Sequence, residues 1–320
     1  MRGLIQKTVF VMALLARFGL AANLRKEGAD PTKLQSQLNS LDQCSSNDIY
    51  VAHMAQTTNH IMELLNGDKK ERPTLLWIGC SLDRFQINAI CNLVGGTTIK
   101  YYPEGSSGKK ASSIVCHSLH ITMGYVQIFG MHKKCHTDAA AFVDPREFDS
   151  ESDRVRALLP ELVESMGSTP THVQVGSNLW DLSKGCNNQL GITEDYQELY
   201  IRGIHEIHDA IADLIPGVHI SWRTGMPIHT DYDARGEGRK LVNQEALNQL
   251  VEHEVRASSS RLRTHESIGS FLDHWSVVRM APTDCCMFPD GRHYPKCSSY
   301  AFFNNWLNRI YTPDGELVKA

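Results

Sequence analysis

Hydrophobic positions along this chain follow two spacings, one typical of buried strands and the other of amphipathic helices. Short apolar runs that stop at a glycine or a polar residue predict strands, and longer segments with an apolar residue every third or fourth position predict helices. Strands are predicted at 74–79, 112–122, 125–130, 171–176 and 218–224, with 275–280 as the candidate last strand. Helices are predicted at 48–67, 82–96, 155–166, 196–215, 241–255 and 298–311.

The order of these elements predicts an α/β fold. Strands that alternate with helices form right-handed crossovers, which produce a mainly parallel sheet with helices on both faces. No repeat, low-complexity tract or long linker divides residues 24–320, so we expect one domain there. Ligands bind at the carboxyl ends of the strands in such sheets. Polar stretches follow residues 79, 175 and 222, and we expect these three to converge.

The first of these stretches, GCSLDR, leaves Ser81 between a strand and a helix. A serine at a helix start is commonly an N-cap. The same position also suits a nucleophile, because the backbone N–H and the helix dipole can stabilise an oxyanion. A serine nucleophile needs a base. The G-x-S-x-G motif of another hydrolase class is absent, since residue 83 is aspartate.

A base is available near the C-terminus, in FPDGRHYPKC (288–297). There Asp290 precedes His293 by three positions, so the carboxylate could hold the imidazole in one tautomer. The competing interpretation is a surface turn, because Pro-Asp-Gly is typical of turns.

The middle stretch, VQVGSNLWDLSKGC (173–186), contains Asn178, whose side-chain amide could face a developing oxyanion. Trp180 and Leu182 are interpreted as packing residues. Asp181 is interpreted as a capping or orienting residue and not as the catalytic acid.

In this order, the segments resemble the SGNH/GDSL hydrolase superfamily, and more closely its PC-esterase and trichome-birefringence-like branch. GCSLDR is similar to the GDSLSRNQ block of that branch, and GSNLWDLS to its LWDLS ending. RTGMPIH (223–229) is similar to RT-x-SP-x-H. The likeness spans about residues 74–310.

The resemblance implies a flavodoxin-like α/β/α sandwich, the SGNH hydrolase fold, and a serine-dependent acyl-ester hydrolase or O-acyltransferase. It implies no cofactor and no metal. The expected substrate is an O-acetylated glycan or another small acyl ester. The implied site residues are Ser81 as nucleophile, His293 as general base, Asp290 as its orienting acid, Ser81 N–H and Asn178 in the oxyanion hole, and Arg84, Arg223 and His229 in substrate binding or site support.

The chain also departs from the family pattern. Cys80 replaces the aspartate of the family's GDS, which motivates an alternative, a non-catalytic carbohydrate-binding or scaffold protein with the same fold. Leu179 replaces an aspartate of the superfamily's middle block, and in the branch's version of that block the asparagine would fall at Gly176 instead of Asn178. The family's glycine after an earlier strand could be Gly96 or Gly130.

The N-terminus predicts a secretory signal peptide at 1–23. Basic residues precede an apolar stretch at 8–16, and small residues follow at 19–23. A mitochondrial presequence and a buried amphipathic helix are the alternatives. No stretch is long and apolar enough to predict a membrane span after signal removal.

Cysteine and charge content extend this picture. Nine cysteines among 320 residues favour an oxidising compartment with disulfides, and hence the secretory pathway or the extracellular space. The formal net charge of −4 comes from interspersed acids and bases, so no nucleic-acid partner is expected. HKKCH (132–136) could bind zinc, but a loop with Cys135 in a disulfide is preferred because no second ligand cluster stands out.

Overall fold

The computed structural model describes residues 48–66, 72–102, 112–131, 146, 148–176, 179–182, 192–226, 241–257, 270–279, 296–312 and 317–318. The chain divides into two compact units, Met1–His53 and Met54–Ala320. Of the first unit, the described residues include only the start of helix α4 (Asp48–Asn66). The predicted signal peptide, HKKCH and the second half of RTGMPIH lie outside the described residues.

The second unit is built on a sheet with the strand order β2-β3-β4-β1-β5-β6-β7. The described strands are β1 (Thr74–Gly79), β2 (Thr97–Tyr101), β3 (Ser113–His117), β4 (Thr122–Gln127), β5 (His172–Gly176), β6 (His219–Arg223) and β7 (Ser270–Leu272). Strands β4, β1, β5, β6 and β7 are parallel, whereas β2 and β3 add an antiparallel edge. The predicted α/β fold with a mainly parallel sheet is confirmed.

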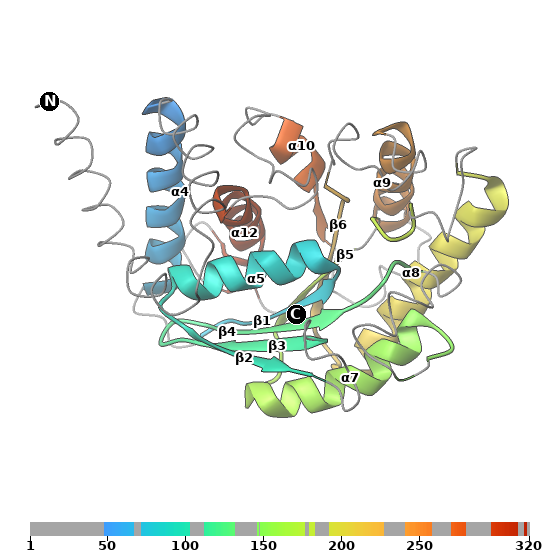
Figure 1. Ribbon diagram of the computed structural model, residues 1–320, viewed down its shortest axis with the longest axis horizontal. Coiled ribbons are helices and arrows are strands. Elements are labelled where there is room, and N and C mark those ends of the chain that lie inside the picture. Colours follow the sequence, from blue (N-terminus) through green and yellow to red (C-terminus); the bar gives the residue numbers. More distant parts are fainter. Residues whose placement is uncertain are drawn as a thin grey trace, which may run out of the picture. The chain divides into compact units, whose positions relative to one another are not determined.

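Helices cover both faces of this sheet (Figure 1). On one face, α7 (Glu151–Met166), α8 (Glu194–Leu214) and α9 (Leu241–Arg256) share a core with Leu76 and Ile78 of β1. On the other, the part of α4 that belongs to the second unit, α5 (Ser81–Leu93) and α12 (Lys296–Ile310) pack against Leu75 and Trp77. Because successive side chains of a strand point to opposite faces, the continuous apolar run of β1 serves both cores.

The sequence prediction placed a break at Met123-Gly124, but both residues lie inside β4. The turn is instead at 118–121. There the Ser118 hydroxyl accepts a hydrogen bond from the Ile121 N–H, and the backbone N–H of Ser118 donates to the Ile121 carbonyl. Gly124 lets the Met166 side chain pack over β4, since a Cβ there would lie 2.5 Å from the Met166 sulfur.

The prediction of a last strand at 275–280 was also wrong. That segment belongs to a short helix, α10 (His274–Arg279), and the strand is the three-residue β7 just before it. The Asp273 carboxylate accepts the N–H of Ser276, which starts the helix as a side-chain cap. The edge strand β2 was missed because its side chains are mostly exposed and carry no strong apolar pattern.

A disulfide joins Cys91 of α5 to Cys116 of β3 inside the second core. It fastens the helix that starts at Ser81 to the antiparallel side of the sheet. Among the helices in the described ranges, none combines the length and apolarity needed to cross a bilayer.

Candidate active site

The chain topology places a crevice at the carboxyl end of β1. This central strand leads into α5 on one face, whereas its neighbours β4 and β5 lead into α7 and α8 on the other face. Connections that diverge to opposite faces leave a crevice between strand ends, where ligands bind in open α/β sheets. Ser81 is separated from β1 by Cys80 alone and therefore stands at this point.

The helix cap at this junction is Cys80 and not Ser81. Cys80 has an extended backbone conformation (φ −97°, ψ −166°), and its carbonyl accepts the N–H groups of Asp83 (3.1 Å) and Arg84 (3.2 Å). In return, the Cys80 N–H donates to the Asp83 carboxylate at 2.9 Å. The interpretation of Ser81 as the N-cap is wrong: Ser81 is the first helical residue and is half-buried.

A buried ion pair joins this junction to another strand. Nε and Nη2 of Arg223, the last residue of β6, donate to the two carboxylate oxygens of Asp83 at 2.8 and 2.5 Å. Both side chains are 1% exposed. Arg223 also donates to the carbonyls of Gly176 (2.7 Å) and Thr224 (2.9 Å). The ends of β1, β5 and β6 thus meet at one guanidinium, as the convergence prediction required.

Two glycines make room for this pair. A Cβ on Gly79 would lie 2.0 Å from an Asp83 carboxylate oxygen, and a Cβ on Gly176 would lie 2.5 Å from Cγ of Arg223. Neither position tolerates a side chain without displacing the ion pair. These glycines are needed for close approach and not for an unusual backbone angle.

The Cys80 side chain is a poor nucleophile. It is 1% exposed, and burial, followed by the nearby Asp83 carboxylate, raises the pKa of the thiol to about 11. Because thiolate is the reactive form, Cys80 stays inert at neutral pH. The hydroxyl of Ser81 is therefore the better candidate at this junction.

The two glycine candidates lie at opposite ends of the sheet. Gly130 follows β4, which runs parallel to β1, and so lies at the same end as Ser81. β2 runs in the same direction as β4, because β3 lies between them and is antiparallel to both. Gly96 precedes β2 and therefore lies at the amino ends of the strands, away from Ser81. Gly96 has a packing reason of its own, because a Cβ there would lie 2.7 Å from the Cys116 sulfur. Of the two glycines, Gly130 is the one that shares this end of the sheet with Ser81.

Gly130 lies close to the Asp181 side chain, which the sequence prediction gave a capping or orienting role. Gly130 has φ +101°, and a Cβ there would lie 2.7 Å from the Asp181 carboxylate. That carboxylate accepts the N–H of Met131 (2.9 Å) and the hydroxyl of Tyr196 (3.0 Å). Burial raises the pKa of Asp181 to about 7. Leu182 is buried, as the packing interpretation predicts, and the Trp180 ring meets Phe129 edge-on at 5.2 Å.

Of the residues implied by the family resemblance, three lie in the described ranges: Ser81, Arg84 and Arg223. Arg84 is half-buried on the first turn of α5. The other four, Asn178, His229, Asp290 and His293, lie outside the described residues, and their roles stay predictions.

The sequence interpretation missed Asp83. Its signal was available, because an acidic residue three positions after a helix cap is typical of a capping box.

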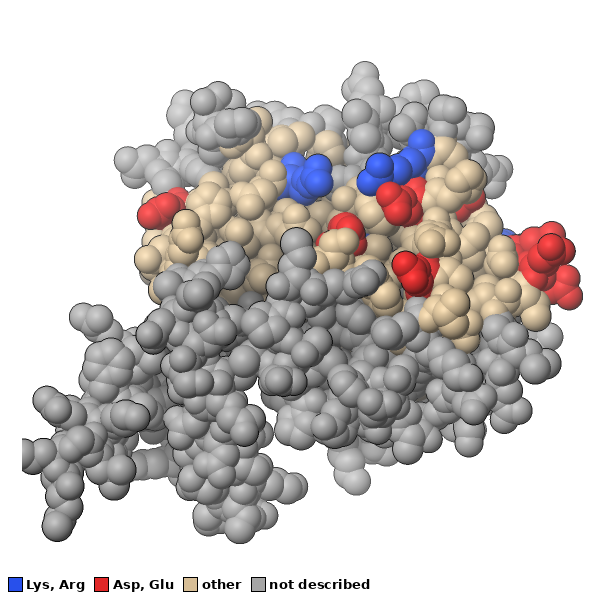
Figure 2. All heavy atoms as spheres, turned by 90° about the horizontal axis from the view of Figure 1, so that it is seen from above, with Lys and Arg blue, Asp and Glu red and all other residues tan. Residues whose placement is uncertain are grey.

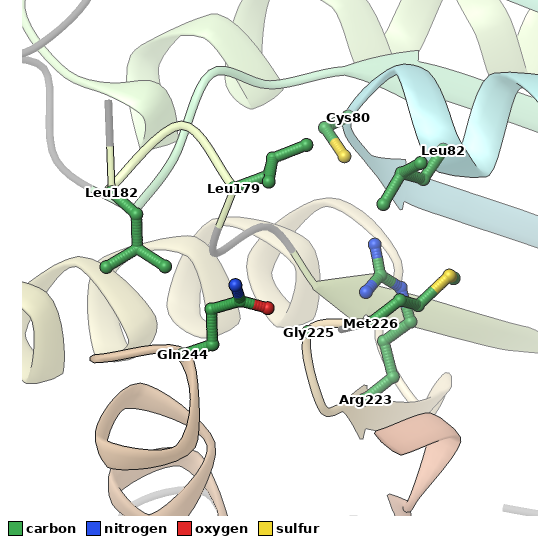
Figure 3. Close-up of a pocket in the computed structure, with 8 residues that line it drawn as sticks. All are labelled: Cys80, Leu82, Leu179, Leu182, Arg223, Gly225, Met226 and Gln244. Atoms are coloured by element: carbon green, nitrogen blue, oxygen red, sulfur yellow. The ribbon is translucent and has the colours of Figure 1, made fainter. Parts of the chain in front are cut away.

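A small pocket opens beside the junction (Figure 3). Its cavity volume is only about 10 Å³, room for about one water molecule, and its lining is mostly apolar, with the Arg223 guanidinium and the Gln244 amide as its polar groups. The lining residues are Cys80, Leu82, Leu179, Leu182, Arg223, Gly225, Met226 and Gln244.

Within the described ranges, no group of three His, Cys, Asp or Glu side chains is placed to hold a metal ion. On the face shown in Figure 2, the described acidic and basic side chains lie interspersed among uncharged surface.

No family model and no curated protein matches the chain. Similar solved structures include a carbohydrate esterase family 3 from Talaromyces cellulolyticus, with 13% identity over 74% of this chain and 97% of that one, at a TM-score of 0.42. A peptidoglycan O-acetylesterase is similar with 11% identity over 79% of this chain and 95% of that one, at a TM-score of 0.40. An ADP-ribosylation-factor-like GTP-binding protein from Encephalitozoon cuniculi is similar with 8% identity over 86% of this chain and 95% of that one, at a TM-score of 0.36. Likenesses this low carry no argument about activity, which has to come from the site.

Proposed function

We propose that this protein is an SGNH-type serine esterase or O-acyltransferase in which Ser81 carries the acyl group. The observation that supports this most is the place of Ser81. It is the first residue of α5, at the carboxyl end of the central strand, and Cys80 already serves as the cap. A hydroxyl at this point has the N-terminal dipole of α5 behind it, which favours negative charge in front of the helix.

In the proposed reaction, Ser81 Oγ forms a bond to the ester carbonyl carbon while His293, oriented by Asp290, takes its proton. The Ser81 N–H and Asn178 stabilise the oxyanion. The carbon–oxygen bond to the alcohol then breaks, and the alcohol leaves with the proton from His293. Water or a sugar hydroxyl attacks the acyl-enzyme, which releases an acid or a new ester and regenerates Ser81.

The proposed substrate class is an O-acetylated glycan, by the branch that the motifs resemble. The buried disulfide Cys91–Cys116 agrees with the proposed extracellular or secretory location, because disulfides persist in oxidising compartments.

The test is Ser81→Ala, assayed for hydrolysis of 4-nitrophenyl acetate and of an acetylated oligosaccharide. The variant should lose at least ~1,000-fold in turnover, because it lacks the hydroxyl that is proposed to form the acyl-enzyme. Ser165→Ala is the matched control, since Ser165 bonds only its own helix backbone on α7 in the contacts described. Unchanged hydrolysis by purified Ser81→Ala would remove Ser81 from this role.

A fluorophosphonate probe separates this proposal from the non-catalytic alternative, which the Cys80 substitution motivates. An active serine displaces fluoride and keeps the phosphonyl group, which intact mass and peptide mapping locate. An adduct on Ser81 supports an enzyme, and an unlabelled folded protein supports a carbohydrate-binding or scaffold protein.

A further inference from the structure

We propose that Asp83 and Arg223 form a positioning pair for Ser81, so that the reactivity of the hydroxyl depends on this ion pair and not only on the fold. This inference rests on the proposed function. Asp83 lies two residues after Ser81, in the same first turn of α5. Its carboxylate is held by two parallel N–H donors of Arg223, at 2.8 and 2.5 Å. A two-point contact of this kind fixes orientation as well as distance.

The carboxylate of Asp83 also holds the residue on the other side of Ser81. It accepts the Cys80 N–H at 2.9 Å, so Ser81 lies between two positions tied to one carboxylate. Tyr125 adds a third contact, because its hydroxyl donates to the Cys80 carbonyl at 2.9 Å. The backbone that carries Ser81 is therefore fixed from both sides.

Arg223 connects this turn to the neighbouring strands. It reaches the Gly176 carbonyl at the end of β5 and the Thr224 carbonyl beyond β6. The segment after β6 is itself fastened, because the Asn248 amide on α9 accepts the Gly225 N–H at 2.6 Å and donates to its carbonyl at 3.2 Å. A shift of Arg223 would thus move Ser81 relative to the rest of the rim.

Stability alone gives little reason for charges here. Apolar side chains of similar volume can replace a buried ion pair with no loss of stability, or even a gain, because both charges lose their hydration. The pair is 1% exposed and lies next to the candidate nucleophile, which is where fixed geometry has chemical value. Since Asp83 neutralises Arg223, we assign Arg223 to positioning and not to binding an anionic substrate.

The decisive experiment removes the carboxylate from position 83 and, in a second variant, places one at position 80 instead. The Arg223 guanidinium points toward Cys80, and both side chains line the same pocket (Figure 3). An aspartate at position 80 would therefore also reach Arg223. We compare wild type, Asp83→Ser and the double variant Cys80→Asp/Asp83→Ser. The readouts are the fluorophosphonate labelling rate at Ser81 and kcat and KM on 4-nitrophenyl acetate, each corrected for the folded fraction.

Asp83→Ser should lower the labelling rate and kcat by ~10- to 100-fold with little change in KM, because a misplaced nucleophile slows the chemical step. The double variant should regain most of the lost rate. Ile207→Ala, in the core on the opposite face, is the control for stability loss, and should lower the melting temperature without changing the labelling rate of the folded protein.

Each outcome decides between the two proposals. A wild type that labels at Ser81, with an Asp83→Ser variant that labels equally fast, overturns the positioning role alone. A wild type that takes no label and hydrolyses no ester overturns the proposed function and this inference with it. If Asp83→Ser does not fold, Arg223→Lys replaces it, since lysine keeps the charge but not the two-point contact. Unchanged labelling of Arg223→Lys would then contradict the inference.

Discussion

The two ends of strands β1, β5 and β6 differ in how they are held together. At the carboxyl ends, Gly79 and Gly176 leave room for the buried charge of Arg223. At the amino ends, the rings of His172 and His219 stack at 4.9 Å, with 8° between their planes. The same parallel strands thus meet at a buried ion pair at their carboxyl ends and at stacked rings at their amino ends.

The amino ends rely on uncharged contacts. The Thr171 hydroxyl donates to the Thr74 carbonyl at 3.1 Å, and His172 Nδ1 lies 3.0 Å from the Thr171 hydroxyl. Burial, followed by the neighbouring His219, lowers the pKa of His172 to about 3, so this ring is neutral at ordinary pH. The comparison teaches that the fold can join these strands without buried charge, and that the charges gather where the proposed chemistry takes place.

The most damaging change should be Gly79→Ala at the carboxyl end. The new Cβ would lie 2.0 Å from the Asp83 carboxylate and 2.9 Å from the Gly176 carbonyl, so both the ion pair and the backbone must shift. We expect a loss of ~4 kcal/mol or more in the free energy of unfolding, which places it among the exceptional single substitutions. Urea denaturation measures it.

Gly95→Ala is the control for Gly79→Ala. Gly95 has φ +64° but nothing within 4 Å of a built Cβ, so only the backbone conformation opposes the substitution. Its expected loss is ~1–2 kcal/mol. Equal losses at the two glycines would contradict the argument that the ion pair is sterically enclosed.

The next effect is a pH dependence at the carboxyl end, from Asp181. Its folded-state pKa is raised to about 7 by burial, above the ordinary value of 3.8. The unfolded state therefore releases its proton first, and the contribution of Asp181 to stability is lost as the pH rises from about 4 through 7. Asp181→Asn, which can still accept from Met131 and Tyr196, should be more stable than wild type at pH 8, by up to ~4 kcal/mol, and about equal to it at pH 4.

Thermal melts of wild type and Asp181→Asn at pH 4, 6 and 8 measure this difference. Asp213→Asn serves as the control, because the Arg156–Asp213 pair is largely exposed, at 43% and 63%, and is worth little. A difference between Asp181→Asn and wild type that does not change with pH would show that folding does not shift the pKa of Asp181.

The smallest effect should come from the amino end, and with the opposite sign. The pKa of His172 is lowered from 6.5 to about 3, so its contribution is present above pH 6.5 and is lost as the pH falls toward 3. His172→Phe keeps a ring against His219 but cannot take up a proton. We expect near-equality with wild type at pH 8 and a more stable variant at pH 4.5, by up to ~3 kcal/mol.

Urea denaturation at the two pH values checks this prediction, with the exposed His253→Gln as control. Greater stability of His172→Phe at pH 8 than at pH 4.5, relative to wild type, would contradict it. Together with Asp181, this variant tests whether the two strand ends respond to pH in opposite directions.

The local patterns predicted most elements because burial leaves a periodic record in the sequence. The run that became β1 and the apolar stripe of α7 came out as predicted. The patterns failed where tertiary contacts decided the outcome. Gly124 looks like a turn residue until Met166 packs over it, and 275–280 looks like a strand until Asp273 caps a helix there. Three of the seven predicted site residues lie in the described ranges, so the predicted catalytic constellation as a whole stays a prediction.

The sequence by itself determined that a serine follows a buried strand, that the sheet is mainly parallel, and that three polar stretches end strands of that sheet. These follow from periodicity and chain order, which are local properties. Only the tertiary structure decided that Gly130 and not Gly96 shares the end of Ser81, and that Asp83 reaches Arg223. Those outcomes depend on strand register and on contacts between residues far apart in the chain, and neither is written in any single segment.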